Sequence, residues 1–193
     1  DVSIAFPNGL RGDRMDESSL RLYREAGCYV IAFAVETVTE RLQRALRKKL
    51  DLDRVAAAVE DAFRLGMIPK GFFMIGFPTE TMEEIRATLG WAFGSRLLMA
   101  GFFSVVPFPR TELHDWSRRY LPDLEGDPRT CFYYADSPPY GRLTGIDLRA
   151  VQRRAYRRFY LSPWRMYHLA RRAPRRRALA RSATAFAQVA FSR

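Results

Sequence analysis

The chain has 193 residues, of which 48% are hydrophobic, so it can form one folded domain and is not fully disordered. Its formal net charge is +11, but this charge is unevenly placed. Residues 146–193 hold 13 arginines and one acid, whereas residues 1–145 carry a net charge of −1. A nearly neutral body disfavours a nucleic-acid-binding protein, and only the basic tail remains a candidate for anionic partners.

The chain has two cysteines, Cys28 and Cys131, and neither belongs to a C-x-x-C or Cys/His cluster. The sequence therefore predicts no metal ligands in this chain, and it favours reduced thiols in a cytoplasmic protein. No apolar run is long enough for a transmembrane helix. The first residues, Asp-Val-Ser-Ile, are typical of the middle of a strand, so we expect the chain to be cut from a longer protein.

Short apolar runs predict strands buried on both faces, as in a parallel sheet. Helical patterns separate them, with starts marked by Asp16 and by the capping boxes Thr37-x-x-Glu40 and Thr81-x-x-Glu84. Gly27 and Gly66 mark two helix ends. The predicted strands are 2–6, 29–35, 71–77 and 101–106, and the helical patterns centre on 16–26, 55–63 and 85–93. Alternating strands and helices predict an α/β fold of right-handed β–α units.

The remaining chain predicts three further regions. Residues 113–121 form a short helix, and 122–145 form an irregular loop with one candidate strand at 131–134. Helices follow at 146–161, 164–173 and 178–191, separated by Pro163 and Pro174. Val151, Ala155, Phe159 and Tyr160 share one side of the first of these. We therefore divide the chain into a β–α body (1–121), a loop region (122–145) and a basic helical tail (146–193).

Polar, Gly and Pro residues follow each predicted strand, at 7–12, 36–37, 76–81 and 107–112. Ligands of parallel α/β folds bind at the carboxyl ends of the strands. Four such segments at one edge of a sheet predict a binding site, although helix caps and ordinary loop chemistry would give a similar pattern.

Several phrases, in this order, resemble the radical SAM superfamily, and most of all its branch with a cobalamin-binding domain ahead of the barrel. The resemblance covers residues 1–113. The phrases are Pro7-Asn8-Gly9-Leu10-Arg11-Gly12-Asp13, Glu25-Ala26-Gly27-Cys28, Val35-Glu36-Thr37, Gly76-Phe77-Pro78-Thr79-Glu80-Thr81 and Pro107-Phe108-Pro109-Arg110-Thr111-Glu112-Leu113.

The resemblance implies a partial (β/α) TIM-like barrel that binds S-adenosylmethionine (SAM) against a [4Fe–4S] cluster and cleaves it to a 5′-deoxyadenosyl radical. It also implies a link to cobalamin and methyl transfer, on an unknown small-molecule or lipid-like substrate. The family's cluster is held by a C-x3-C-x2-C loop, which this chain lacks. We therefore expect a fragment, remnant or half of a split enzyme that is inactive alone, with no metal ligand and no catalytic residue assigned.

The resemblance assigns cofactor contacts only to matching positions. Glu36 and Thr37 match the segment that meets the ribose and methionyl parts of SAM, although Thr37 could instead be a helix cap. Asn8 could contact cofactor or substrate, or serve only as a turn residue. Gly76, Phe77 and Pro78 match a motif near the adenine, and Val106 and Pro107 match a strand edge whose backbone also meets adenine.

Three departures from the family pattern lie in these segments. Val38, Thr79 and Arg110 stand where the family usually has glycine. If those glycines have positive φ, the replacements strain the turns.

The basic tail leaves three interpretations open. In the first, the tail docks on the body and its arginines face solvent. In the second, it lies on an anionic membrane surface, and in the third, it binds nucleic acid. The membrane interpretation would insert Trp164, Leu179, Phe186 and Phe191, and would make a cytoplasmic protein peripheral to the membrane. The alternative to a radical SAM enzyme is a non-catalytic α/β module whose tail binds membrane or nucleic acid.

Overall fold

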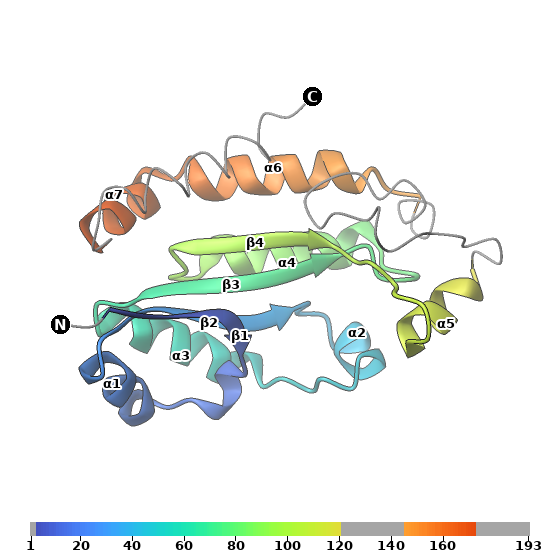
Figure 1. Ribbon diagram of the computed structural model, residues 1–193. Coiled ribbons are helices and arrows are strands. Elements are labelled where there is room, and N and C mark those ends of the chain that lie inside the picture. Colours follow the sequence, from blue (N-terminus) through green and yellow to red (C-terminus); the bar gives the residue numbers. More distant parts are fainter. Residues whose placement is uncertain (1–2, 121–144, 173–193) are drawn as a thin grey trace.

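The computed structural model of the protein describes residues 3–120 and 145–172. Its centre is a four-stranded sheet in the order β1-β2-β3-β4, with every neighbouring pair parallel (Figure 1). The strands are β1 (Ile4–Leu10), β2 (Cys28–Glu36), β3 (Ile68–Ile75) and β4 (Met99–Ser104). The sheet follows chain order and is not closed, so the predicted α/β partial barrel is confirmed.

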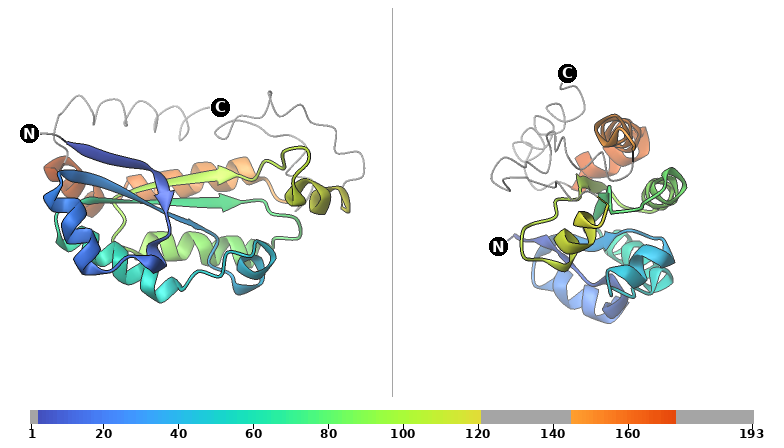
Figure 2. Two further views of the ribbon diagram at one scale, coloured as in Figure 1. Left: turned by 60° about the horizontal axis from the view of Figure 1, so that its bottom comes forward. Right: turned by 90° about the vertical axis from the view of Figure 1, so that its right-hand side faces the viewer.

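Helices pack mainly on one face of this sheet (Figure 2). The helices are η1 (Gly12–Arg14), α1 (Glu17–Glu25), α2 (Glu40–Ala45), α3 (Leu52–Arg64), α4 (Met82–Gly94), α5 (Glu112–Arg118), α6 (Leu148–Tyr160) and α7 (Pro163–Arg172). The main core joins residues of α1, α3, α4 and α6 to the sheet residues Ile31, Phe33, Phe73 and Phe102, all fully buried.

The opposite face of the sheet is less covered than the apolar strands predict. On β3, the core residues Phe73 and Ile75 are fully buried, but Lys70, Phe72 and Met74 alternate with them and are only partly buried. The Lys70 ammonium lies 4.5 Å from the centre of the Phe72 ring, and burial lowers the pKa of this lysine.

Local signals placed most helix ends correctly. Asp16 caps α1 by accepting a hydrogen bond from the Ser19 amide at 2.8 Å. The predicted capping box of Thr81 and Glu84 opens α4. Gly27 and Gly66 have φ of 96° and 79°, as expected of glycines that follow a helix end.

Helix α6 covers the free edge of β4, and its side chains satisfy the backbone there. The Phe102 backbone amide donates to Tyr156 Oη at 3.0 Å, and the side-chain amide of Gln152 donates to the Phe102 carbonyl at 2.6 Å. Tyr160 Oη accepts from the Ala100 amide at 3.0 Å and donates to the Ala100 carbonyl at 2.9 Å. The three side chains are four residues apart and so share one helix face. They take the place of a fifth strand, and the docking interpretation of the tail is confirmed for α6.

The other boundaries differ modestly from the predictions. β3 begins three residues before the predicted strand 71–77, and α7 starts at Pro163 itself. The predicted strand 131–134 and helix 178–191 lie outside the described residues, and the three-part division of the chain stays a prediction. Among the described residues, the helices are too short or too polar to cross a membrane.

Candidate functional site at the carboxyl ends of the strands

The carboxyl ends of all four strands lie at one edge of the sheet, because the strands are parallel. Figure 1 shows α2 and α5 at this edge, beyond the arrowheads. The segments that the sequence singled out therefore lie at one edge. A feature of this edge that the sequence did not predict is a set of ion pairs that begins at α2.

These ion pairs connect segments that follow different strands. Arg41 binds Glu84 at 2.6 Å, and its guanidinium also donates to the Thr79 carbonyl and hydroxyl, each at 3.0 Å. Arg47, just after α2, binds Glu112 of α5 at 3.1 Å. The loops after β2, β3 and β4 are thus tied together by arginines from one short region of the chain.

Glu36 is the last residue of β2 and has a positive φ of 64°. A non-glycine residue costs about 1–2 kcal/mol in this conformation, and such strain concentrates at functional sites. Its carboxylate binds Lys48 at 2.6 Å. Glu36, whose backbone is strained, lies at the site edge, and the contact of its carboxylate with SAM stays a prediction.

Thr37 is fully buried. Its hydroxyl lies 3.3 Å from the hydroxyls of both Thr39 and Thr88, and the Gln43 amide donates to its carbonyl. The alternative in which Thr37 caps a helix is wrong: α2 begins at Glu40 after Thr39, because the Thr37 hydroxyl is engaged with α4 instead. Thr37 therefore joins the end of β2 to α4.

The motif of Gly76, Phe77 and Pro78 follows β3, and all three residues are buried. Gly76 has a φ of 92°, and a Cβ here would overlap Cδ1 of Leu148, at the start of α6. Phe77 packs in a small core with Leu42 and other apolar residues. In this arrangement Leu148 makes the close approach to Gly76, and the contacts of the three residues with adenine stay predictions.

Replacing Gly76 with alanine is expected to destabilise the fold by about 2 kcal/mol. The left-handed conformation penalises any side chain, and the added methyl group collides with a buried leucine. Urea unfolding of Gly76→Ala measures the loss, and Leu148→Ala in the same background should remove its steric part. A Gly76→Ala loss below about 0.5 kcal/mol would contradict this close contact.

The remaining sequence candidates lie on the two outer strands. Val106 and Pro107 follow β4 and are buried, and the Val105 amide continues the pairing with the Ile75 carbonyl at 2.9 Å. Asn8 lies inside β1 and is exposed, so the prediction of a loop after residue 6 is wrong. The edge position of β1 and a register irregularity between Phe6 and Leu10 accommodate the proline before Asn8.

Glu80 was quoted as part of a motif but was given no role, and it is the most unusual acid of the site. Its side chain is 2% exposed, and its Oε2 accepts from the amides of Gly76 at 2.5 Å and Phe77 at 3.1 Å. Its Oε1 is buried without a hydrogen-bond partner. Burial raises the pKa of Glu80 to about 7.

Two of the three departures from the family's glycines carry strain. Thr79 and Arg110 have φ of 63° and 67°, whereas Val38 is not among the residues with positive φ. The bonds from Arg41 to the carbonyl and hydroxyl of Thr79 hold that turn in place. The predicted strained turns are therefore confirmed after β3 and β4.

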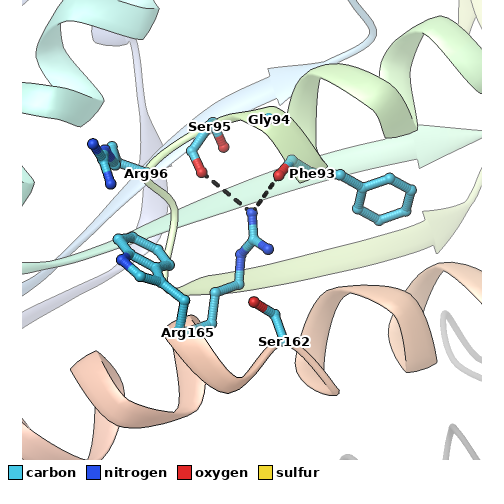
Figure 3. Close-up of a pocket in the computed structure, with 7 residues that line it drawn as sticks. Phe93, Gly94, Ser95, Arg96, Ser162 and Arg165 are labelled. Atoms are coloured by element: carbon cyan, nitrogen blue, oxygen red, sulfur yellow. Dashed lines mark hydrogen bonds between the residues drawn. The ribbon is translucent and has the colours of Figure 1, made fainter.

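A separate open pocket of about 380 Å³ lies away from this edge. It is lined by residues that end α4 and begin α7, and so it lies before β4 rather than after it. Figure 3 shows the Arg165 guanidinium directed at the backbone carbonyls of Phe93 and Ser95. Arg165 is 7% exposed, so its contacts join α7 to the end of α4.

The residues of this chain do not fit a [4Fe–4S] cluster. Cys28 is fully buried at the start of β2, at the opposite end of that strand from Glu36, and its thiol donates to the Val30 carbonyl. Cys131 lies outside the described residues. Within the described part, no group of three or more His, Cys, Asp or Glu side chains could hold a metal ion. A carboxylate that could accept from SAM is present at the site edge, where Glu36 is only partly buried.

Comparisons with known proteins agree with this geometry. Residues 6–92 match the radical SAM superfamily. The chain is 36% identical over 116 residues to cytidylyl-2-hydroxyethylphosphonate methyltransferase of Streptomyces wedmorensis, covering 56% of this chain and 22% of that protein. It is 28% identical over 165 residues to an uncharacterized methyltransferase of Pyrococcus horikoshii, covering 84% of this chain and 35% of the relative.

An uncharacterized protein of Methanocaldococcus jannaschii is 31% identical over 81 residues, which are 42% of this chain and 18% of that protein. The chain thus spans between about a fifth and about a third of the length of these relatives. The motif order, the parallel sheet and the matched segment all agree. The predicted resemblance to the radical SAM superfamily is therefore confirmed for residues 6–92.

Proposed function

We propose that this chain supplies four strands and the SAM-facing strand ends of a radical SAM methyltransferase. The observation that carries the proposal is the convergence of four parallel strand ends within and just after the segment that matches the superfamily. The methyltransferase names of two relatives support methyl transfer as the reaction. The ligands of the cluster would come from outside these 193 residues, since the chain has only two cysteines.

In this proposal Glu36 is the residue that binds the cofactor. The Glu36 backbone is strained at the end of β2, and its partly buried carboxylate is held in place by Lys48. A carboxylate there accepts hydrogen bonds from ribose hydroxyls or from the methionyl amine. Glu80 fixes the backbone turn after β3 that would face the adenine. Cobalamin remains a proposed cofactor of the whole protein, and a small molecule or a lipid its proposed substrate.

Equilibrium dialysis with radiolabelled SAM tests the proposal on the 193-residue chain. We expect saturable binding that Glu36→Gln weakens about 10-fold, because a charge-assisted hydrogen bond is lost. Glu40→Gln, an exposed acid at the start of α2, should bind as the wild type does. Anaerobic incubation with iron and sulfide should give no visible iron–sulfur absorption from this chain alone.

Two outcomes would overturn the proposal. If SAM does not bind, or if Glu36→Gln and the wild type bind it equally, Glu36 is not the cofactor acid. An absence of any binding would favour the non-catalytic α/β module.

A further inference from the structure

Helices α6 and α7 each carry exposed side chains on their outer side. Figure 1 shows the two helices following one another along one side of the molecule. Their inward residues contact the body: Tyr156 bonds to β4, and Arg165 to the end of α4. The outward positions are exposed, and we call them the outer strip: Arg154, Arg157, Leu161, Met166, Tyr167 and Arg171.

The outer strip is unusually apolar for a surface. Leu161, Met166 and Tyr167 are 64%, 47% and 57% exposed. They are half of the six large apolar side chains that are exposed in the described part of the chain. Grouped apolar side chains on a surface mark a site that meets a partner or a membrane.

The same strip is strongly basic. The chain has no acid between residues 148 and 172, and Asp147 is engaged as the cap of α6 through the Ala150 amide at 2.9 Å. Exposed arginines thus flank the apolar side chains on both helices, and Arg171 also donates to Tyr167 Oη at 3.0 Å. A partner complementary to this strip must carry negative charge and accept apolar side chains.

We propose that the outer strip binds an anionic lipid surface, with the arginines at the lipid phosphates and Leu161, Met166 and Tyr167 in the interfacial layer. An amphipathic basic helix lies on a membrane in this way. A nucleic acid backbone would satisfy the arginines but would offer no apolar layer to these three side chains.

The structure changes which side chains would enter the lipid. Trp164 was expected to insert, but its ring packs 5.3 Å from the ring of Phe63 on α3. Met166 and Tyr167 take the outward positions of α7 instead. Leu179, Phe186 and Phe191, also expected to insert, lie outside the described residues.

Vesicle flotation of the 193-residue protein tests the proposal. We expect it to float with vesicles of phosphatidylcholine and phosphatidylglycerol, to stay behind with pure phosphatidylcholine, and to be released as salt is raised. Equal flotation with both kinds of vesicle, or none with either, would overturn the proposal. A duplex DNA shifted by protein concentrations that leave anionic vesicles unbound would overturn it in favour of nucleic acid.

Matched variants distinguish binding through the outer strip from a general effect of net charge. Arg154→Gln, Arg157→Gln and Arg171→Gln together should lower the partition coefficient on anionic vesicles about 100-fold. Arg24→Gln, Arg54→Gln and Arg118→Gln remove the same charge from exposed positions on α1, α3 and α5, and should leave it within about threefold of the wild type. Equal losses in the two sets would overturn the assignment to the strip.

The apolar part has its own variant. Leu161→Ser with Met166→Ser should lower the partition coefficient at least about 10-fold while the net charge is unchanged. Both residues are exposed, so thermal unfolding of this variant should match that of the wild type and exclude misfolding as the cause. Unchanged partitioning would exclude insertion of these side chains.

Discussion

Replacing Arg165 with methionine is expected to destabilise the protein by about 4 kcal/mol. The guanidinium donates to the carbonyls of Phe93 at 2.7 Å, Leu97 at 3.1 Å and Ser95 at 3.2 Å, and it reaches the Ala92 carbonyl at 3.3 Å. Methionine fills a similar volume but donates nothing, so several carbonyls at and just after the end of α4 lose a charged donor. Urea unfolding followed by circular dichroism measures the change.

Arg96 provides the matched control for Arg165. It lines the same pocket, stacks on Trp164 at 5.2 Å and binds Glu60 at 3.3 Å, but it is exposed. Arg96→Met should cost less than about 1 kcal/mol, since exposed ion pairs contribute little. Comparable losses in the two variants would show that burial of the guanidinium is not what matters.

The Arg165 contacts also explain why a basic tail can be part of the fold. Arg172 of the same helix donates to the Met67 carbonyl at 2.8 Å and stacks on Phe63. These two arginines satisfy backbone acceptors of the body, whereas the arginines of the outer strip are exposed. Some arginines of the tail therefore hold it on the body and others are exposed, and composition alone does not distinguish the two groups.

The sequence predicted the elements whose signals are local. The capping box at Thr81 and the glycine after α3 each depend on neighbours a few residues away, and both were confirmed. The capping box at Thr37 has the same local pattern but failed, because its hydroxyl meets Thr88, 51 residues later. A local sequence pattern contains no information on a contact with a residue so far along the chain, so it predicts the helix cap instead.

The candidate site shows the same division. Sequence motifs placed Glu36, Gly76 and Val106 at one edge of the sheet, because parallel strands bring their ends together. They did not indicate that Leu148, 72 residues after Gly76 in the chain, lies against it. The role of Glu80 was also hidden, since an orphaned oxygen is a property of packing and not of a motif.

Glu80 gives the second large expectation, a loss of stability as the pH rises. Its pKa is raised from 4.5 to about 7 in the folded protein by burial. Between these two values the folded state holds a proton that the unfolded state has released, so the stabilisation present at low pH is lost as pH rises through about 7. The loss is about 3 kcal/mol, from about 1.4 kcal/mol for each unit of the shift.

Other groups change stability outside this window or in the opposite direction. The pKa of Asp16 is lowered to about 2, and those of Asp13 and Glu84 are also lowered, so their contributions are lost only as pH falls through the acid range. The pKa of His168 is lowered by burial, so it makes the protein less stable as pH falls. A variant that changes Glu80 alone separates its effect from these.

Glu80→Gln is that variant, because glutamine keeps an oxygen that can accept from the Gly76 and Phe77 amides but cannot ionise. Urea unfolding from about pH 5 to about pH 8 should show the wild type losing about 3 kcal/mol more than Glu80→Gln, which becomes the more stable protein at the upper end. Glu83→Gln, an exposed acid three residues on, should follow the wild type. Parallel pH profiles for Glu80→Gln and the wild type would mean that Glu80 is ionised throughout, with a proton donor on its second oxygen.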